Sequence, residues 1–163
     1  MTGLRKYWWI FIPALVVAMI DRLTKCYYIQ KLHDNGVFVF DHPWLAISFQ
    51  PTINPGMAFS LPVANEIIAT ISFVLCVILI IWAWNSFSAG KAWLSSVIAV
   101  VMLSASSNIF DRIYWQGVID FIAIRIGPIH WSIFNVADMG IVVGLLLIIL
   151  LTTYPQINRK STN

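Results

Sequence analysis

The sequence predicts an α-helical integral membrane protein with four transmembrane helices and a small extracytoplasmic β-sheet packed with loops on the helix ends. Of its 163 residues, 60% are hydrophobic and only 10% are charged, whereas soluble domains carry roughly 25% charge. Long uncharged apolar runs recur along the chain, and its eight Trp and five Tyr are typical of aromatic belts at membrane surfaces. We therefore expect lipid to cover much of the apolar surface.

The predicted helices are the four segments that reach or approach the roughly 20 apolar residues needed to span a bilayer. They cover about residues 7–29, 66–84, 92–111 and 136–155 of a single domain, 1–163. The first reaches spanning length only if it continues through Asp21, Arg22 and Lys25. It starts like a signal peptide but lacks a small-residue cleavage site, so we expect an uncleaved anchor helix.

The two long connections, about residues 30–65 and 112–135, lie on the same side of a four-helix chain. Their stretches GVFVF, WLAISF and VIDFIAIRI alternate in a way that predicts short strands, with plain loops as the alternative. The opposite side carries basic residues and no acid: Arg5, Lys6, Lys91, Arg159 and Lys160. By the positive-inside rule, both termini are cytoplasmic and the long connections lie outside.

Two classes of partner are excluded by composition. The ten basic residues are dispersed, with no basic run among aromatics, so we expect no nucleic-acid partner. The cysteines and histidines, Cys26, Cys76, His33, His42 and His130, show no metal-ligand spacing, so we expect no metal and no cofactor.

Two polar motifs lie at or beyond the predicted outer end of the first helix. Asp21 and Lys25 are one helical turn apart, which is typical of an i,i+4 ion pair. Asn54-Pro-Gly56 has the residues of a turn, although its backbone and amide groups could equally clamp an extended peptide, and the loop up to Phe59 could close over it. Each motif has a structural interpretation of its own.

Two more polar motifs mark the facing ends of the third and fourth predicted helices. Asn108 shares a helix face with Asp111 and Arg112, which is typical of a polar helix terminus. Asn135 is a good N-cap, and Asp138, at the third helical position, favours the positive end of the helix dipole. These residues too are explained without any function.

The positions of Asp120 and Asp138 add a chemical interpretation. Asp120 lies in a strand-like run after the third helix, and Asp138 begins the fourth, so both can meet at the outer membrane face. Two close carboxylates share a proton, which is how aspartic proteases activate water. The alternative is a proton-coupled transporter or channel subunit, whose acids should lie near mid-membrane; clustering at one face favours an enzyme.

The motif set resembles the lipoprotein signal peptidases (signal peptidase II) of bacteria over nearly the whole chain. The matching residues are Asp21 and Lys25, Asn54-x-Gly56-x-Ala58-Phe59, Asn108-x-x-Asp111-Arg112, Gly117-Val-x-Asp120-Phe121 and Phe134-Asn135-x-Ala137-Asp138. Each motif alone is weak, but five in this order are specific.

The resemblance implies an inner-membrane aspartyl endopeptidase that cuts diacylglyceryl-modified prolipoproteins just before the lipidated cysteine and is inhibited by globomycin. It implies a catalytic dyad of Asp120 and Asp138. The substrate-binding residues that it implies are Asn54, Gly56, Asn108, Arg112, Asn135, Asp21 and Lys25. We expect a monomer in contact with membrane lipids.

Two departures from the family pattern bear on substrate preference. Arg22 stands where the family usually has Gln, and residues 104–108 read Ser-Ala-Ser-Ser-Asn where glycines are usual. Serines in place of glycines would narrow a close helix contact or alter the fit of lipid.

Overall fold

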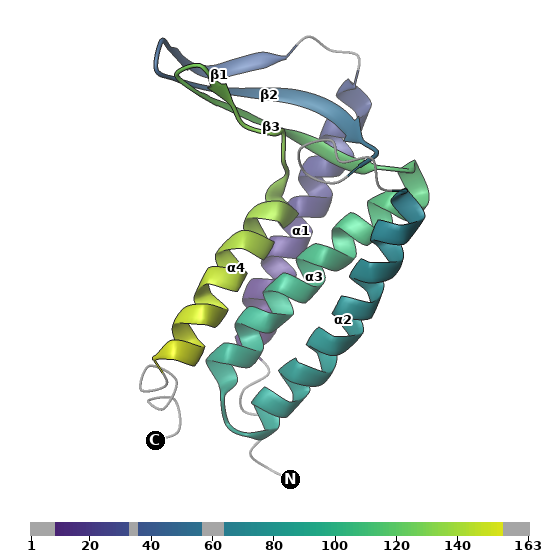
Figure 1. Ribbon diagram of the computed structural model, residues 1–163, viewed down its shortest axis with the longest axis vertical. Coiled ribbons are helices and arrows are strands. Elements are labelled where there is room, and N and C mark those ends of the chain that lie inside the picture. The colour runs from purple at the N-terminus through teal and green to yellow at the C-terminus, as the bar shows by residue number, and fades with distance from the viewer. Residues whose placement is uncertain (1–8, 33–35, 57–63, 155–163) are drawn as a thin grey trace.

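The computed structural model describes residues 9–32, 36–56 and 64–154 as a helical bundle with a sheet across one end (Figure 1). The elements in chain order are α1 (Ile12–Tyr28), the 3-10 turn η2 (Ile29–Lys31), β1 (Val37–His42), β2 (Leu45–Asn54), α2 (Asn65–Ser88), α3 (Ala92–Trp115), β3 (Val118–Ile126), β4 (Ile129–His130) and α4 (Val136–Thr153). Helix α1 begins, and α4 ends, at the end of the bundle away from the sheet.

Three of the described helices, α2, α3 and α4, are long and apolar enough to cross a membrane. Helix α1 has 17 residues and includes Asp21, Arg22 and Lys25, so its length and charge set it apart from the other three. Residues 7 and 8 of its predicted range lie outside the described part of the chain.

Two helices extend beyond their predicted ends. Helix α2 continues to Ser88, because nothing in its last turn stops a helix before Gly90, whose φ is 73°. Helix α3 continues to Trp115 and ends where Gln116 takes a left-handed conformation, with a φ of 56°. Asn108 and Arg112 therefore lie within the last two turns of α3 and do not end it.

Helix α3 is the centre of the bundle and packs against α1, α2 and α4. Its Leu94, Ile98 and Val101 form a buried apolar cluster with Ile148 and Leu151 of α4. Helix α2, in contrast, is the least buried of the three long helices, and its apolar side chains face outward, as they can in lipid.

Two glycines bring α4 close to α3. A Cβ atom on Gly140 would collide with the hydroxyl of Ser104, and one on Gly144 would collide with the side chain of Val101. Ser104, one of the serines that depart from the family pattern, therefore packs directly against the backbone of α4. Whether the serine narrows this contact relative to a glycine stays a prediction.

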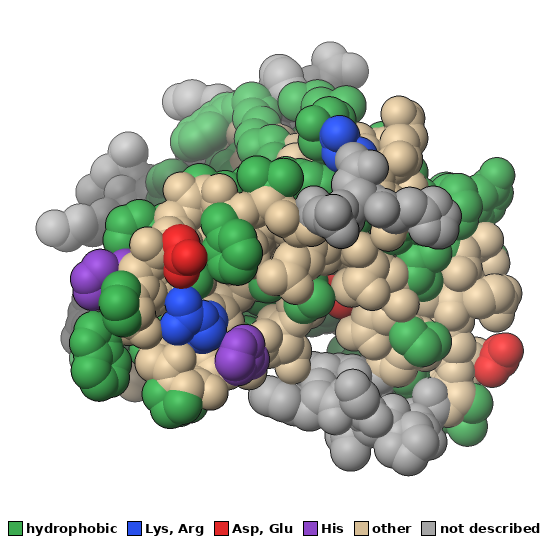
Figure 2. Space-filling model, turned by 90° about the horizontal axis from the view of Figure 1, so that it is seen from above, with side chains coloured by type: hydrophobic (Ala, Val, Ile, Leu, Met, Phe, Trp, Pro, Cys, Tyr) green, Lys and Arg blue, Asp and Glu red, His purple; other side chains and the backbone are tan. Residues whose placement is uncertain are grey.

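The predicted sheet is confirmed, with antiparallel strands in the order β1-β2-β3-β4. Tyr28, at the end of α1, stacks on Phe121 of β3 with ring centroids 4.4 Å apart, which fastens the sheet to the bundle. Figure 2 looks onto this end of the molecule, where charged side chains are few. Arg125 and Asp41 form an ion pair of 3.2 Å across the sheet.

Candidate active site

Asp120 lies near the start of β3, opposite Thr52 of β2. Its side chain is almost completely buried, and both carboxylate oxygens accept hydrogen bonds from amide groups. The Nδ2 atom of Asn54 donates to Oδ2 over 3.1 Å, and the Nδ2 atom of Asn135 donates to Oδ1 over 2.7 Å. The end of β2 and the start of α4 together fix the direction of this carboxylate.

Asp138 is placed by the N-terminus of α4. Asn135 is the N-cap: its Oδ1 accepts the N–H of Asp138 over 2.9 Å, and its own N–H donates to Asp138 Oδ2 over 3.2 Å. This reciprocal pair is a capping box. Asn108 of α3 also donates from Nδ2 to Asp138 Oδ1 over 2.8 Å. The predicted N-cap is therefore present, and it also orients an acid.

Asn135 connects the two aspartates. Its side-chain nitrogen holds Asp120, while its side-chain oxygen and backbone N–H hold Asp138. Asn135 is completely buried, so these hydrogen bonds are shielded from competing water. One residue thereby fixes the positions of both carboxylates relative to each other.

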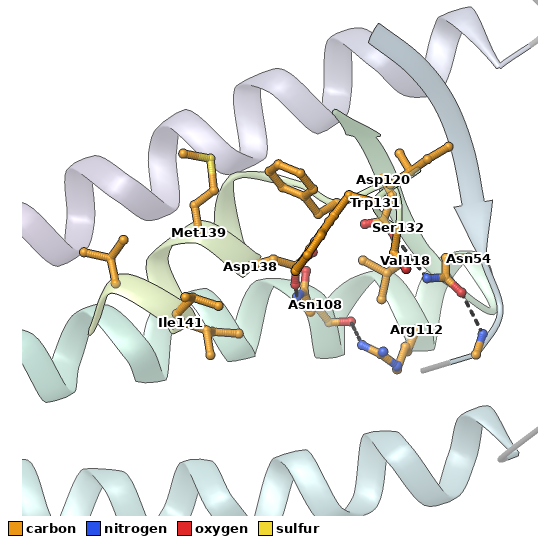
Figure 3. A pocket seen from close by; sticks show the side chains of 15 residues that line it. Asn54, Asn108, Arg112, Val118, Asp120, Trp131, Ser132, Asp138, Met139 and Ile141 are labelled. Carbon is orange, nitrogen blue, oxygen red and sulfur yellow. Dashed lines mark hydrogen bonds between the residues drawn. The ribbon is translucent and has the colours of Figure 1, made fainter. Parts of the chain in front are cut away.

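Both carboxylates line a pocket of about 510 Å³ (Figure 3). At one end of the pocket are polar groups of Asn54, Gly56, Asn108 and Arg112, which the sequence singled out as substrate-binding residues. The other end is apolar and is formed by α4, including Met139, Ile141, Val142 and Val143. The pocket therefore offers one polar end and one hydrocarbon-like end beside the same pair of acids.

The electrostatics of the pocket favour a shared proton. Burial raises the pKa of Asp120 to about 7, with a further upward contribution from the negative charge of Asp138, while the amide hydrogen bonds of Asn54 and Asn135 oppose the rise. Near neutral pH, Asp120 can therefore take up or release a proton. One protonated and one ionised carboxyl group is the arrangement needed for acid–base hydrolysis of an amide.

Asp21 and Lys25 lie behind the pocket wall. Both are completely buried, and Lys25 Nζ lies 3.0 Å from Asp21 Oδ2 and 2.9 Å from Asp111 Oδ2. The same ammonium donates to Asn108 Oδ1 over 2.7 Å. The predicted i,i+4 ion pair is thus part of a larger buried cluster that reaches the site through Asn108.

Arg112 and Asp111 are neighbours in the sequence but have different partners. Asp111 pairs with Arg22, over 2.8 Å, and with Lys25, whereas Arg112 lines the pocket and donates from Nη1 to the carbonyl of Asn108 over 3.3 Å. Its Nε is buried without a hydrogen-bond partner among the described residues. This nitrogen is therefore an unused donor in a residue of the pocket wall.

Sequence reasoning missed one wall of the pocket, formed by Trp131 and Ser132. The backbone N–H of Trp131 donates to the carbonyl of Ile124 over 2.9 Å, which ties this segment to β3. An aromatic residue only four positions before the N-cap Asn135 was the available signal. Residues 57–63, with Ala58 and Phe59 and the suggested closing loop, lie outside the described residues.

The described residues contain no group of three or more His, Cys, Asp or Glu side chains that could hold a metal ion. The pocket does contain the carboxyl groups of Asp120 and Asp138. Their amide donors leave both carboxylates with lone pairs for a water molecule and a substrate.

Comparison with known proteins gives consistent results. The family described as "Signal peptidase (SPase) II" matches residues 13–154. The chain is 36% identical to the lipoprotein signal peptidase of Coxiella burnetii (strain Dugway 5J108-111), over 89% of this chain and 90% of that one. It is 28% identical to the lipoprotein signal peptidase of Pelagibacter ubique (strain HTCC1062), over 99% and 96% of the two chains.

A similar fold also occurs in a solved bacterial membrane enzyme. That structure, at 2.3 Å resolution, has a TM-score of 0.69 and 24% sequence identity, over 94% of this chain and 93% of that chain. A second bacterial membrane enzyme, at 1.9 Å, has a TM-score of 0.66 and 25% identity. The arrangement of the bundle and the sheet is therefore shared with membrane enzymes.

Proposed function

The chain belongs to the signal peptidase II family, and on that premise we propose that Asp120 and Asp138 are its catalytic dyad. As a family member, it is an aspartic protease of the membrane that removes signal peptides from prolipoproteins. The alternative of a proton-coupled transporter has no support among these matches.

The observation that carries the dyad assignment is the bridge through Asn135. One buried amide side chain and its backbone hold both carboxylates at one pocket, and Asp120 has a pKa raised to about 7. The positive end of the helix dipole favours the ionised form of Asp138. Asp138 therefore acts as the base, and Asp120 carries the proton.

The proposed reaction uses these two states in turn. Asp138 takes a proton from a water molecule while the oxygen of that water attacks the carbonyl carbon of the peptide bond. At the same time, Asp120 donates its proton to the carbonyl oxygen. The tetrahedral intermediate then collapses as the leaving nitrogen is protonated by Asp138. Both protons are accounted for, and Asp120 recovers its own from the hydroxyl group of the intermediate.

The remaining pocket residues are assigned by what they contact. Asn54, Gly56 and Arg112 face the polar end of the pocket and bind the extended peptide backbone of the substrate. Asn108 lines the pocket and holds Asp138, whereas Asn135 is completely buried and acts by holding both aspartates. Asp21 and Lys25 act from behind the wall, through the hydrogen bond of Lys25 to Asn108.

The apolar end of the pocket supports the finer substrate assignment. A cysteine bearing a diacylglyceryl group brings hydrocarbon next to the bond that is cut, and each buried methylene contributes roughly 0.8 kcal/mol. Met139, Ile141, Val142 and Val143 of α4 offer the matching surface. We assign cleavage just before that cysteine, and we assign this pocket as the binding site of globomycin-type cyclic peptides.

Placement in the membrane follows from the distribution of charge. Helix α1 serves as a fourth span, because the charges of Asp21 and Lys25 are buried against α3 and do not face lipid. The sheet and the dyad lie at the outer face of the bacterial inner membrane, and both termini are cytoplasmic, in agreement with the basic residues expected on the other side. We also propose that the enzyme works as a monomer.

The test is cleavage of a purified diacylated prolipoprotein in detergent micelles. Asp120→Asn and Asp138→Asn should each lower kcat at least about a thousandfold, as loss of a catalytic group does in other proteases. Asp41→Asn is the matched control, because Asp41 is an exposed aspartate of the sheet, and it should cleave like the wild type. Near wild-type turnover by either dyad variant would overturn the assignment.

A further inference from the structure

A buried group of four charged side chains, here named the ion cluster, lies directly behind the dyad. It consists of Asp21, Arg22 and Lys25 of α1 and Asp111 of α3. The three N–H bonds of Lys25 each have an acceptor, on Asp21, Asp111 and Asn108. Arg22 Nη1 lies 2.8 Å from the other oxygen of Asp111.

The ion cluster contacts the chain immediately before each catalytic aspartate. Asp21 Oδ1 accepts the backbone N–H of Ala137, next to Asp138, over 2.8 Å. Asp111 Oδ2 accepts the backbone N–H of Ile119, next to Asp120, over a longer 3.4 Å. These contacts bring β3 and the first turn of α4 to the same four side chains.

A third contact reaches the dyad through one intermediate residue. Lys25 holds Asn108 by its side-chain oxygen, which leaves the amide nitrogen of Asn108 to donate to Asp138 over 2.8 Å. Because oxygen and nitrogen sit on the same planar amide, fixing one end directs the other. The position of the ammonium group of Lys25 therefore sets the hydrogen bond to Asp138.

The charges of the ion cluster balance, and Arg22 is needed for that balance. Asp21 and Asp111 carry two negative charges, and Lys25 and Arg22 carry two positive charges. The side chains of Asp21, Lys25 and Asp111 are 0% exposed, whereas that of Arg22 is 30% exposed. Buried charges are costly unless they are paired, so without Arg22 a single ammonium would have to serve two carboxylates.

We propose that Arg22 is a positioning residue for catalysis, which neutralises Asp111 and thereby leaves Lys25 in place to hold Asn108 against Asp138. The proposal rests on the assignment of Asp120 and Asp138 as the dyad. Arg22 itself is fixed from two further sides, since its guanidinium lies 5.1 Å from the ring centroid of Phe110 and donates to the carbonyl of Ser107 over 3.4 Å.

Removal of the charge on Arg22 has two consequences. Lys25 is drawn toward the two carboxylates and weakens its hold on Asn108, and one uncompensated negative charge remains behind the dyad. Among the described residues, Lys25 and Arg112 are the cations that act on the dyad, Asp21 and Asp111 bind the backbone beside it, and Arg22 lies behind Asp111. A net loss of positive charge from this set makes Asp120 hold its proton to a higher pH.

The experiment compares Arg22→Lys, Arg22→Gln and Arg22→Met in the full-length protein in detergent micelles. Arg22→Gln and Arg22→Met should lower kcat for a diacylated prolipoprotein about tenfold or more, because small displacements of a catalytic group are costly, with KM within about twofold of the wild type on the same reasoning. In a plot of kcat against pH, the fall in activity on the alkaline side should move to higher pH in these two variants. Arg22→Lys keeps the charge and should restore most of the turnover.

Arg125→Met is the matched control, because Arg125 pairs with Asp41 on the exposed sheet and not with the ion cluster. It should leave kcat and the pH profile unchanged. If Arg22→Gln kept the kcat and pH profile of the wild type, the charge of Arg22 would have no positioning role. Equal losses in Arg22→Lys and Arg22→Met would overturn the proposal as well.

A second readout does not depend on cleavage. The titration of the Asp120 carboxyl carbon, followed by ¹³C NMR and assigned with Asp120→Asn, should move to higher pH in Arg22→Met and stay unchanged in Arg125→Met. An unchanged titration in Arg22→Met would contradict the proposal. A shifted titration in a protein that cleaves no prolipoprotein would instead refute the proposed function and leave the link between Arg22 and Asp120 standing.

Discussion

The two pairs of aspartates in this protein differ in the kind of partner that holds them. Asp21 and Asp111 each have an oppositely charged group within 3.0 Å, from Lys25 or Arg22. Asp120 and Asp138 accept hydrogen bonds from the amides of asparagines and from backbone N–H groups. Both pairs lie at the same end of the bundle, so their surroundings differ mainly in charge.

The difference shows how one residue type serves two purposes. A neighbouring cation balances the charge of a buried carboxylate, which suits a structural tie. Neutral amides orient a carboxylate without supplying a full opposite charge, so burial can still raise its pKa, as at Asp120. The chemistry of each pair is therefore set by its partners.

The largest expected effect comes from removing the cation at the centre of the first pair. Lys25→Met should lower the free energy of unfolding by about 3–5 kcal/mol, because it leaves Asp111 with only the partly exposed Arg22 and leaves the buried Asp21 without a cation among the described residues. Thermal unfolding in detergent would measure the loss. Arg125→Met, in the exposed pair with Asp41, should change stability by about 1 kcal/mol or less. A similar loss of stability in both variants would show that the buried and the exposed ion pairs do not differ as proposed.

A middle-sized effect is expected from pH on the second pair. The dyad needs one proton, and the pKa of Asp120 is raised to about 7, so kcat/KM should fall above that pH by up to tenfold per unit. The measurement is a pH profile of prolipoprotein cleavage. A profile that stays flat from pH 6 to about 9 would show that the proton on Asp120 is not used.

The same raised pKa has a consequence for stability, whose sign follows from proton counting. Between the unfolded pKa of about 3.9 and the folded value of about 7, the folded protein holds a proton on Asp120 that the unfolded chain has lost. The contribution of this group to stability therefore decreases as pH rises through that window and is constant above it. Asp120→Asn should remove this part of the pH dependence.

The smallest expected effect comes from a single amide donor. Asn54→Ala removes a hydrogen bond that favours the ionised form of Asp120, so the alkaline limb should move upward by less than about one pH unit. Asn65→Ala is the matched control, since Asn65 donates to the carbonyl of Arg112 and to neither aspartate. A downward shift in Asn54→Ala would contradict the role given to these amides.

Most of the fold could be predicted from the sequence because its signals are local. Contiguous stretches of sequence show the apolar runs of α2, α3 and α4 and the alternation of the strands. Asn135 likewise had the sequence pattern of an N-cap. The end of α3 was less visible, since Gln116 is not a residue that usually stops a helix. Its left-handed backbone depends on the turn into β3.

Several residues that line the candidate pocket were predicted from the sequence, but their arrangement was not. The sequence brought Asp120 and Asp138 together by their places at facing element ends. It could not show that Lys25 lies behind the pocket wall, or that Asp111 would choose Arg22 over Arg112, because those pairings depend on the rotation of α1 against α3. The available signal was the group Asp21, Arg22 and Lys25 in the otherwise apolar helix α1. Its two cations outnumber its one acid, so an acid on a neighbouring helix was to be expected.

The hydrogen bond between Asp21 and the N–H of Ala137 joins residues 116 positions apart. During synthesis, α1 enters the membrane long before α4 has been translated, and until then Asp21 has no N–H group of α4 to accept. This tie between α1 and α4 can therefore form only after the rest of the chain has been made and the two helices have met.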